Sequence, residues 1–160
     1  MPDAPPTLAR LVQEERELQF DRFDHDVAWE LGLALVAAAR EAGAPLTVDI
    51  RRNGHQLFHA ALPGTAPDND AWIARKTRVV DRFGHSSFHV GERARQAGTT
   101  FEEQMRLDPD AYAAHGGAFP ITVRGVGVIG TVAVSGLPQV EDHVFVVTQL
   151  AAFLGHGGLG

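Results

Sequence analysis

A histidine directly before two glycines, in AAHGGAFPI at residues 113–121, offers the most chemistry of any segment in this sequence. Consecutive glycine N–H groups can form a concave nest that holds an anion, and the imidazole of His115 could bind a metal or a cofactor. Gly116 and Gly117 also permit a sharp bend before Pro120 begins a run of β-forming residues. The segment therefore allows a cofactor corner, an anion cradle or a simple bend.

A second candidate anion site is Ser135–Gly136, which directly precedes the segment predicted as the last helix. The first N–H groups of a helix have no partner within the helix, and the helix dipole favours negative charge there. Taken alone, each segment is more often a turn or a helix cap. Because both flank the same predicted hairpin, residues 115–117 and 135–136 could form two walls of one pocket.

Two histidines raise the question of a metal site. His85 and His89 are four residues apart, the spacing at which two histidines on one helix face bind zinc. No glutamate stands between them as in H-E-x-x-H, and no third ligand is indicated, so the sequence predicts no metal site. A haem iron needs only one axial imidazole, and His85, His89 or His115 could each supply it.

Charged and hydroxyl side chains give a further option, catalysis on a small anionic substrate. Lys76 or Arg51 would neutralise the charge of the substrate, glycine N–H groups would hold an oxyanion, and a histidine would act as general base. Ser86, within FGHSS, is predicted to border the same pocket. The G-x-G-x-x-G match at 125–130 is followed by a strand-like segment, which excludes a dinucleotide fingerprint.

Hydrophobic periodicity and turn signals predict the elements that must position these residues. Helices are expected over residues 7–18, 24–43, 70–84, 85–98 and 137–154, with one or two short helical turns within 99–117. Hairpins are expected at 46–62 and 119–136. The charged run QEERE at 13–17 is expected to face solvent.

The first predicted hairpin turns at Asn53-Gly54, a strong signal for a two-residue turn. Pairing across that turn places Val48 and Ile50 opposite His59 and Leu57. Asp49, Arg51, Gln56 and Phe58 are then expected to share the other face of the hairpin.

The order of these elements contains two hairpins and no β-α-β alternation. This order predicts an α+β fold with a mostly antiparallel sheet flanked by helices. A chain of 160 residues is most simply one domain, and we expect flexible ends at 1–6 and 155–160.

The amino-acid composition limits the kinds of partner and chemistry that the protein can have. A net charge of −6 with 14 scattered basic residues argues against nucleic acid and anionic membranes. The sequence has no cysteine, which excludes disulfides and thiolate chemistry. Together with an N-terminus that lacks the features of a signal peptide, this composition predicts a cytoplasmic protein.

Several joined motifs resemble one known family. GGAFPITVRGVGVIGTVAVSG at 116–136, followed by EDH at 141–143, is similar to the haem-degrading domain family, the GlcG/HbpS-like proteins. LTVDIRRNGHQLFHAAL resembles the first hairpin of that family, and AWIARKTRVVDRFGHSS its helix with an internal A-x-x-K-x. FGHSS and AAHGGAFPI are closer still to a UPF branch of the family.

The resemblance covers most of the chain. It implies a profilin-like, GlcG-like fold, homo-oligomers built from dimers and, in parts of the family, binding of haem or a corrinoid and degradation of haem. The sequence departs from the family pattern by the insertion of Phe119, and by HSS in place of a segment with a small residue and a proline. Both departures fall at the expected pocket, so the ligand is left open.

These observations support three hypotheses about function. The first is an oligomeric protein that binds haem or a related tetrapyrrole. The second is an enzyme that acts on a small anionic substrate, and the third is a structural or interaction protein whose glycines serve packing alone. The first two share one set of expected ligand-binding residues: Arg51, Lys76, His85, Ser86, His115, Gly116, Gly117, Ser135 and Gly136.

Overall fold

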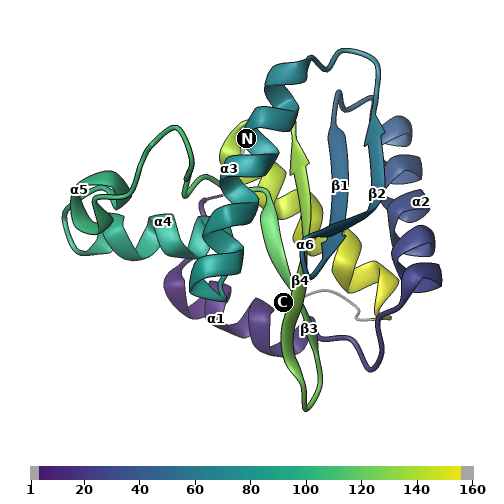
Figure 1. Cartoon of the computed structure of the whole chain (residues 1–160), viewed down its shortest axis with the longest axis horizontal. Helices are drawn as coiled ribbons and strands as arrows, with labels where there is room; N and C mark the ends of the chain where they lie inside the picture. Colours follow the sequence, from purple (N-terminus) through teal and green to yellow (C-terminus); the bar gives the residue numbers. More distant parts are fainter. Residues whose placement is uncertain (1–3, 156–160) are drawn as a thin grey trace.

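A four-stranded sheet in the order β2-β1-β4-β3 forms the centre of the protein (Figure 1), in a computed structural model that describes residues 4–155. The strands are β1 (Thr47–Arg52), β2 (His55–Ala61), β3 (Ala118–Val123) and β4 (Gly127–Ser135). Every pair of neighbouring strands is antiparallel. The prediction of an α+β fold with an antiparallel sheet is confirmed.

Helices cover both faces of this sheet (Figure 1). The helices are α1 (Leu8–Glu17), α2 (His25–Ala42), α3 (Pro67–Phe83), α4 (Ser87–Gln96), α5 (Phe101–Met105) and α6 (Gln139–Phe153). α2 and α6 pack against each other and form the main core with one face of the sheet. α3 lies on the opposite face, and α4 joins α3 to α1.

Alternation along the central strands separates the two faces. Val48 and Ile50 of β1, with Val132 and Val134 of β4, are fully buried in the core formed with α2 and α6. Ala133, one residue out of phase, packs in the smaller cluster with α3. The centre of the sheet is thus buried on both sides, which fixes the strand ends that border the candidate site.

A β-bulge changes the register of the first hairpin. Arg51 pairs with Gln56, as a two-residue turn requires, but the next pair is Ile50 with Phe58, so that Leu57 is skipped. The predicted pairing of Ile50 with Leu57 and of Val48 with His59 is therefore wrong. The prediction that Phe58 shares a face with Asp49 is wrong as well: the bulge turns Phe58 to the face of Ile50, where its ring packs against Gly32 of α2.

Two helices begin at positions other than those expected. α3 starts at Pro67, three residues before the predicted start, because the Asn69 side chain accepts a hydrogen bond from the Ala66 N–H at 2.8 Å. α4 starts after Ser86, whose hydroxyl accepts from the His89 N–H at 3.1 Å. His85 therefore precedes α4 and does not belong to the helix.

The outer edge of β3 meets the segment between α1 and α2. Phe20 forms a bridge to Val123: its N–H donates to Thr122 O at 2.8 Å, and its carbonyl accepts from the Arg124 N–H at 2.9 Å. This contact ties residues 18–23 to the strand.

The expected flexibility of residues 1–6 and 155–160 falls mostly outside the described residues and stays a prediction, as does the single domain. Within 4–155, no helix has the length and the apolar run needed to cross a membrane.

Candidate functional site

A cavity of about 230 Å³ opens between α3, the 115–117 segment and the beginning of α6. It lies where β4 ends and α6 begins, as the two-wall arrangement of residues 115–117 and 135–136 predicts. Its walls are mostly polar and are made by Asp68, Asn69, Trp72, Lys76, His115, Gly116, Ser135, Gly136, Leu137, Gln139 and Asp142.

Lys76 reaches the cavity from the buried side of α3 and is only 2% exposed. Its ammonium donates to Gly116 O at 3.0 Å, to Val134 O at 2.6 Å and to Asp142 Oδ2 at 3.4 Å. Three N–H protons thus meet three acceptors, on three different segments of the chain. Burial lowers the pKa of Lys76, and the Asp142 carboxylate opposes this effect. The side chain ties α3, β4 and α6 together at the cavity.

Asp142 lies in the first turns of α6 and is buried beside Lys76. Its Oδ1 accepts a hydrogen bond from the Leu137 N–H at 3.0 Å, so the carboxylate occupies the N-terminal end of the helix, where an anion is favoured. Burial raises the pKa of Asp142 to about 6, although Lys76 and the backbone N–H groups of Leu137 and Gly136 act in the opposite direction. A side chain of the protein therefore fills one of the two anion sites expected from the sequence.

The two glycines are explained by close packing. A Cβ at Gly116 would overlap the Gln139 carbonyl, and one at Gly117 would overlap the Lys76 ammonium and lie 2.6 Å from Val134 O. Gly117 also has a φ of +129°, which other residues rarely adopt. The Gly116 N–H donates to Gln139 Oε1 at 3.1 Å and is not free for an anion. The bend that the sequence allows is present, and both glycines are needed to form it.

His115 and Trp72 form the rim of the cavity. Their ring centroids are 5.1 Å apart at an interplanar angle of 55°. His115 is exposed, yet the atoms around it remove part of its hydration, and this desolvation lowers the pKa of its imidazole below 6.5. The ring is therefore mostly neutral at pH 7. The guanidinium of Arg75 lies over Trp72, 4.4 Å from the ring centroid.

The structure brings together most of the residues that the sequence pointed to. Lys76, His115, Gly116, Ser135 and Gly136 line the cavity, and Gly117 adjoins it through its close approach to Lys76.

Arg51, His85 and Ser86 do not line this cavity. Arg51 lies on the first hairpin and donates to Asp49 at 2.9 Å. Ser86 is fully buried as the N-cap of α4, and His85 lies next to it. The FGHSS segment therefore forms no wall of the cavity, contrary to the expected pocket.

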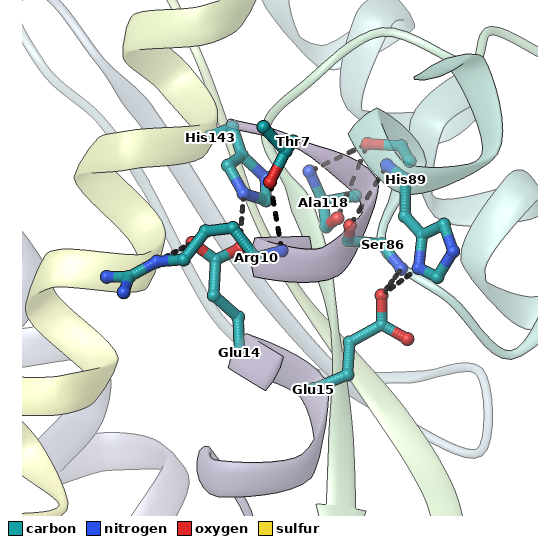
Figure 2. Close-up of polar contacts among 9 residues, drawn as sticks. Thr7, Arg10, Glu14, Glu15, Ser86, His89, Ala118 and His143 are labelled. Carbon is teal, nitrogen blue, oxygen red and sulfur yellow. Dashed lines mark hydrogen bonds and ion pairs between the residues drawn. The ribbon is translucent and has the colours of Figure 1, made fainter. Parts of the chain in front are cut away.

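A second polar cluster joins α1 to α4 and α6 (Figure 2). Figure 2 shows Glu14 turned toward His143 of α6 and Glu15 turned toward His89 of α4. Glu14 Oε1 is 2.8 Å from His143 Nε2, and both side chains are almost fully buried. The expectation that QEERE faces solvent is wrong for these two glutamates, because each finds a histidine partner from another helix.

Glu15 contacts two imidazoles. Its Oε2 is 2.5 Å from His89 Nδ1 and its Oε1 is 2.6 Å from His85 Nδ1. Burial alone would raise the pKa of Glu15, but hydrogen bonds and charge from His89 and His85 outweigh it and hold the pKa below 4.5. The carboxylate is therefore ionised at neutral pH.

Sequence reasoning missed several residues of these two sites, among them Trp72, Asp142, Glu14 and Glu15. Trp72 was visible only as part of the apolar face of a helix, and Asp142 only as an acidic residue near a helix N-terminus. Glu14 and Glu15 stand in a charged run that gives no sign of its partners. The one available signal was the spacing of His85 and His89, which lacked a third ligand.

Comparison with known proteins gives the class of this protein. Residues 23–151 match the family described as haem degrading protein HbpS-like, and the chain belongs to this family. It is 66% identical over 150 residues to a UPF0303 protein of Streptomyces coelicolor, covering 94% of this chain and 95% of the relative. The resemblance read from the sequence, including its UPF branch, is confirmed.

Solved structures agree with this assignment. The crystal structure of Ybr137w protein superposes with a TM-score of 0.86 at 37% identity, covering 92% of this chain and 88% of that one. A structure described as a PduOC:Heme complex superposes with a TM-score of 0.65 at 19% identity, covering 81% and 94%. The second likeness shows the shared fold.

Proposed function

We propose that this protein binds a small ligand at the mouth of the cavity that Lys76 and Asp142 line, called here the Lys76–Asp142 cavity. The ligand class that we propose is haem or a related tetrapyrrole. The observation that carries the proposal is the mostly neutral, exposed imidazole of His115 beside Trp72. Neutral imidazole is the form that binds iron, and an aromatic ring offers a stacking surface to a macrocycle. The description of the family as haem degrading, and the haem complex of the same fold, support this ligand class.

The residues present could hold a tetrapyrrole at the rim of the cavity but not in its interior. Cavities that enclose a drug-sized ligand measure about 300–1,000 Å³, whereas this one measures about 230 Å³. Its inner walls carry polar groups such as Asn69, Gln139 and Asp142, which suit water or a small polar group. The residues that would hold a macrocycle therefore lie at the mouth: His115 would bind the iron, and the guanidinium of Arg75, whose Nε donates to Pro109 O, could offer its remaining N–H groups to a propionate. The bound iron would supply any redox chemistry, and the residues of this chain would hold and orient it.

The other two hypotheses receive unequal support. An enzyme acting on an anion needs free donors, but Lys76 uses all three of its N–H protons, and the N–H groups of Gly116 and Leu137 are also engaged. The raised pKa of Asp142 would suit acid–base work, yet both of its oxygens accept hydrogen bonds within the protein. Close packing explains the glycines, as the structural hypothesis requires, but it does not explain an open cavity with a neutral imidazole at its mouth.

Titration with haemin tests the proposal. We expect a shift of the Soret band at micromolar haemin, weakened about tenfold or more in His115→Ala because the axial ligand is lost. His55→Ala serves as the matched control, since His55 is an exposed histidine on the first hairpin, outside the cavity, and its loss should leave the shift unchanged.

The absence of a Soret shift, or an equal shift in His115→Ala, would refute the proposal. The mass of the protein in solution should be measured on the same sample. Homo-oligomers built from dimers and a cytoplasmic location both stay predictions.

A further inference from the structure

The contact of Glu15 with His85 and His89 brings three potential metal ligands together from two parts of the chain. One ligand atom from each residue lies within 4.8 Å of the other two. The imidazole rings are stacked at a tilt, with centroids 4.4 Å apart, and both direct Nδ1 at the same carboxylate. Figure 2 shows the Glu15 side chain reaching from α1 toward His89 on α4.

Two imidazole nitrogens and one carboxylate oxygen make a donor set typical of zinc. Zinc sites with an open coordination position commonly use two histidines and one glutamate, with water in the fourth position. Nitrogen and oxygen donors of this kind suit zinc and its neighbours among the transition metals better than calcium or magnesium, which prefer oxygen alone.

We propose that Glu15, His85 and His89 bind one divalent transition-metal ion of the zinc type. Each histidine binds through Nδ1 as a neutral ring with its one proton on Nε2, so that the ion takes the place of the hydrogen bonds between the two Nδ1 atoms and Glu15. Ligands of a tetrahedral zinc ion are about 3.3 Å apart. The Glu15 oxygens are 2.6 Å and 2.5 Å from the two Nδ1 atoms, so the carboxylate must withdraw from both rings for the ion to enter.

The surroundings of the three residues allow this change. The side chain of His85 is 38% exposed, so that the ion has an entry path and a water can complete its coordination. His89 is held at the first turn of α4 by the Ser86 cap, and the Ser86 N–H lies 3.4 Å from Glu15 Oε2, where it orients the carboxylate. The ion would replace a hydrogen-bonded link between α1 and α4 by a coordinated one.

This site is separate from the proposed haem site. None of its three residues lines the Lys76–Asp142 cavity, and the axial candidate His115 belongs to a different segment. Either site can therefore be present without the other.

The experiment uses the full chain after removal of metal with EDTA. Calorimetric titration with zinc chloride should show one ion per chain, and bound zinc should raise the melting temperature. Co²⁺ in place of zinc should give the visible d–d absorption of a four-coordinate ion, a signal that a merely structural cluster would not produce.

Variants assign the ligands. Glu15→Gln and His85→Gln should each weaken zinc binding about tenfold or more, because each removes one of three protein ligands. His59→Gln is the matched control. His59 also pairs with a carboxylate, that of Asp70, at 2.6 Å, but this pair belongs to no candidate metal cluster within residues 4–155. It should bind zinc as the unchanged protein does. His85 is partly exposed, so His85→Gln is expected to fold, and circular dichroism checks this.

The proposal is overturned if the unchanged protein binds no zinc at micromolar concentration, or if His85→Gln binds it equally well. Failure here is distinguishable from failure of the proposed function: His115→Ala should keep the zinc response, and His85→Gln should keep the haemin response.

Discussion

Replacing Lys76 by methionine tests whether one buried ammonium holds the cavity together. Methionine keeps most of the length of the side chain but removes its charge and its three donors. Gly116 O, Val134 O and Asp142 then lose a partner, and the carboxyl group of Asp142, 3% exposed, must either stay buried as an unpaired charge or take up a proton. Removal of one partner of a buried ion pair costs about 3–5 kcal/mol, and we expect Lys76→Met to lower the free energy of unfolding by that amount at pH 7.

A double-mutant cycle separates the pair from the other contacts. Lys76→Met combined with Asp142→Asn should cost less than the sum of the single changes by about 1–3 kcal/mol, because the unpaired carboxylate is then absent. The measurement is urea denaturation followed by circular dichroism, with the slope against urea compared between variants.

The free energy of unfolding of Lys76→Met should also depend on pH. Burial already raises the pKa of Asp142 to about 6, and loss of the Lys76 ammonium raises it further, whereas the unfolded chain titrates near 3.9. Between these values the folded state binds more protons than the unfolded state. The free energy of unfolding of Lys76→Met should therefore rise, relative to the double variant, as the pH falls from 7 to 5, with a slope of at most about 1.4 kcal/mol per pH unit.

Two results would refute this reasoning. One is a loss below about 1 kcal/mol in Lys76→Met at pH 7, which would mean that water replaces the ammonium without penalty. The other is a difference between the single and the double variant that is equal at pH 7 and pH 5.

Three glycine-to-alanine substitutions, one of them a control, test the packing. Gly117→Ala should cost more than about 2 kcal/mol in urea denaturation, whereas Gly125→Ala, also at positive φ but in open space, should cost about 1 kcal/mol; equal costs would contradict the overlap with Lys76 and Val134. An alanine in place of glycine within a helix usually stabilises by about 0.5–1 kcal/mol. Gly32→Ala should instead lower the free energy of unfolding by about 1–3 kcal/mol, because its Cβ overlaps the Phe58 ring. In a Phe58→Ala background, where the ring is absent, Gly32→Ala should raise the free energy of unfolding.

The fold was largely predictable because its signals are local. Asn53 and Gly54 adopt the positive φ values, 49° and 81°, that the Asn-Gly turn indicates, and the two hairpins form where predicted. The antiparallel sheet follows from the order of the elements. The bulge at Leu57 could not be predicted, because it depends on the space that Gly32 leaves in a helix 25 residues earlier.

The position of the cavity could be predicted from the sequence, but the contacts inside it could not. The corner of residues 115–117 and the end of β4 do border one cavity, since both flank the same hairpin. That Asp142 occupies the helix N-terminus, and that Lys76 turns inward to meet it, depends on contacts between residues 66 positions apart. Glu15 and His85 are 70 positions apart, so that no local pattern in the sequence could pair them.

The contact of Phe20 with β3 has a consequence for how the sheet can grow. An edge strand with free N–H and C=O groups is a template onto which a strand of another chain can add, a common start of aggregation. Along β3, Pro120 has no N–H to offer, and Phe20 already takes Thr122 O and the Arg124 N–H. Strand addition at this end of the sheet would first have to displace Phe20, which is 3% exposed, from the core. The β3 edge is thereby protected against fibril-like pairing along its second half.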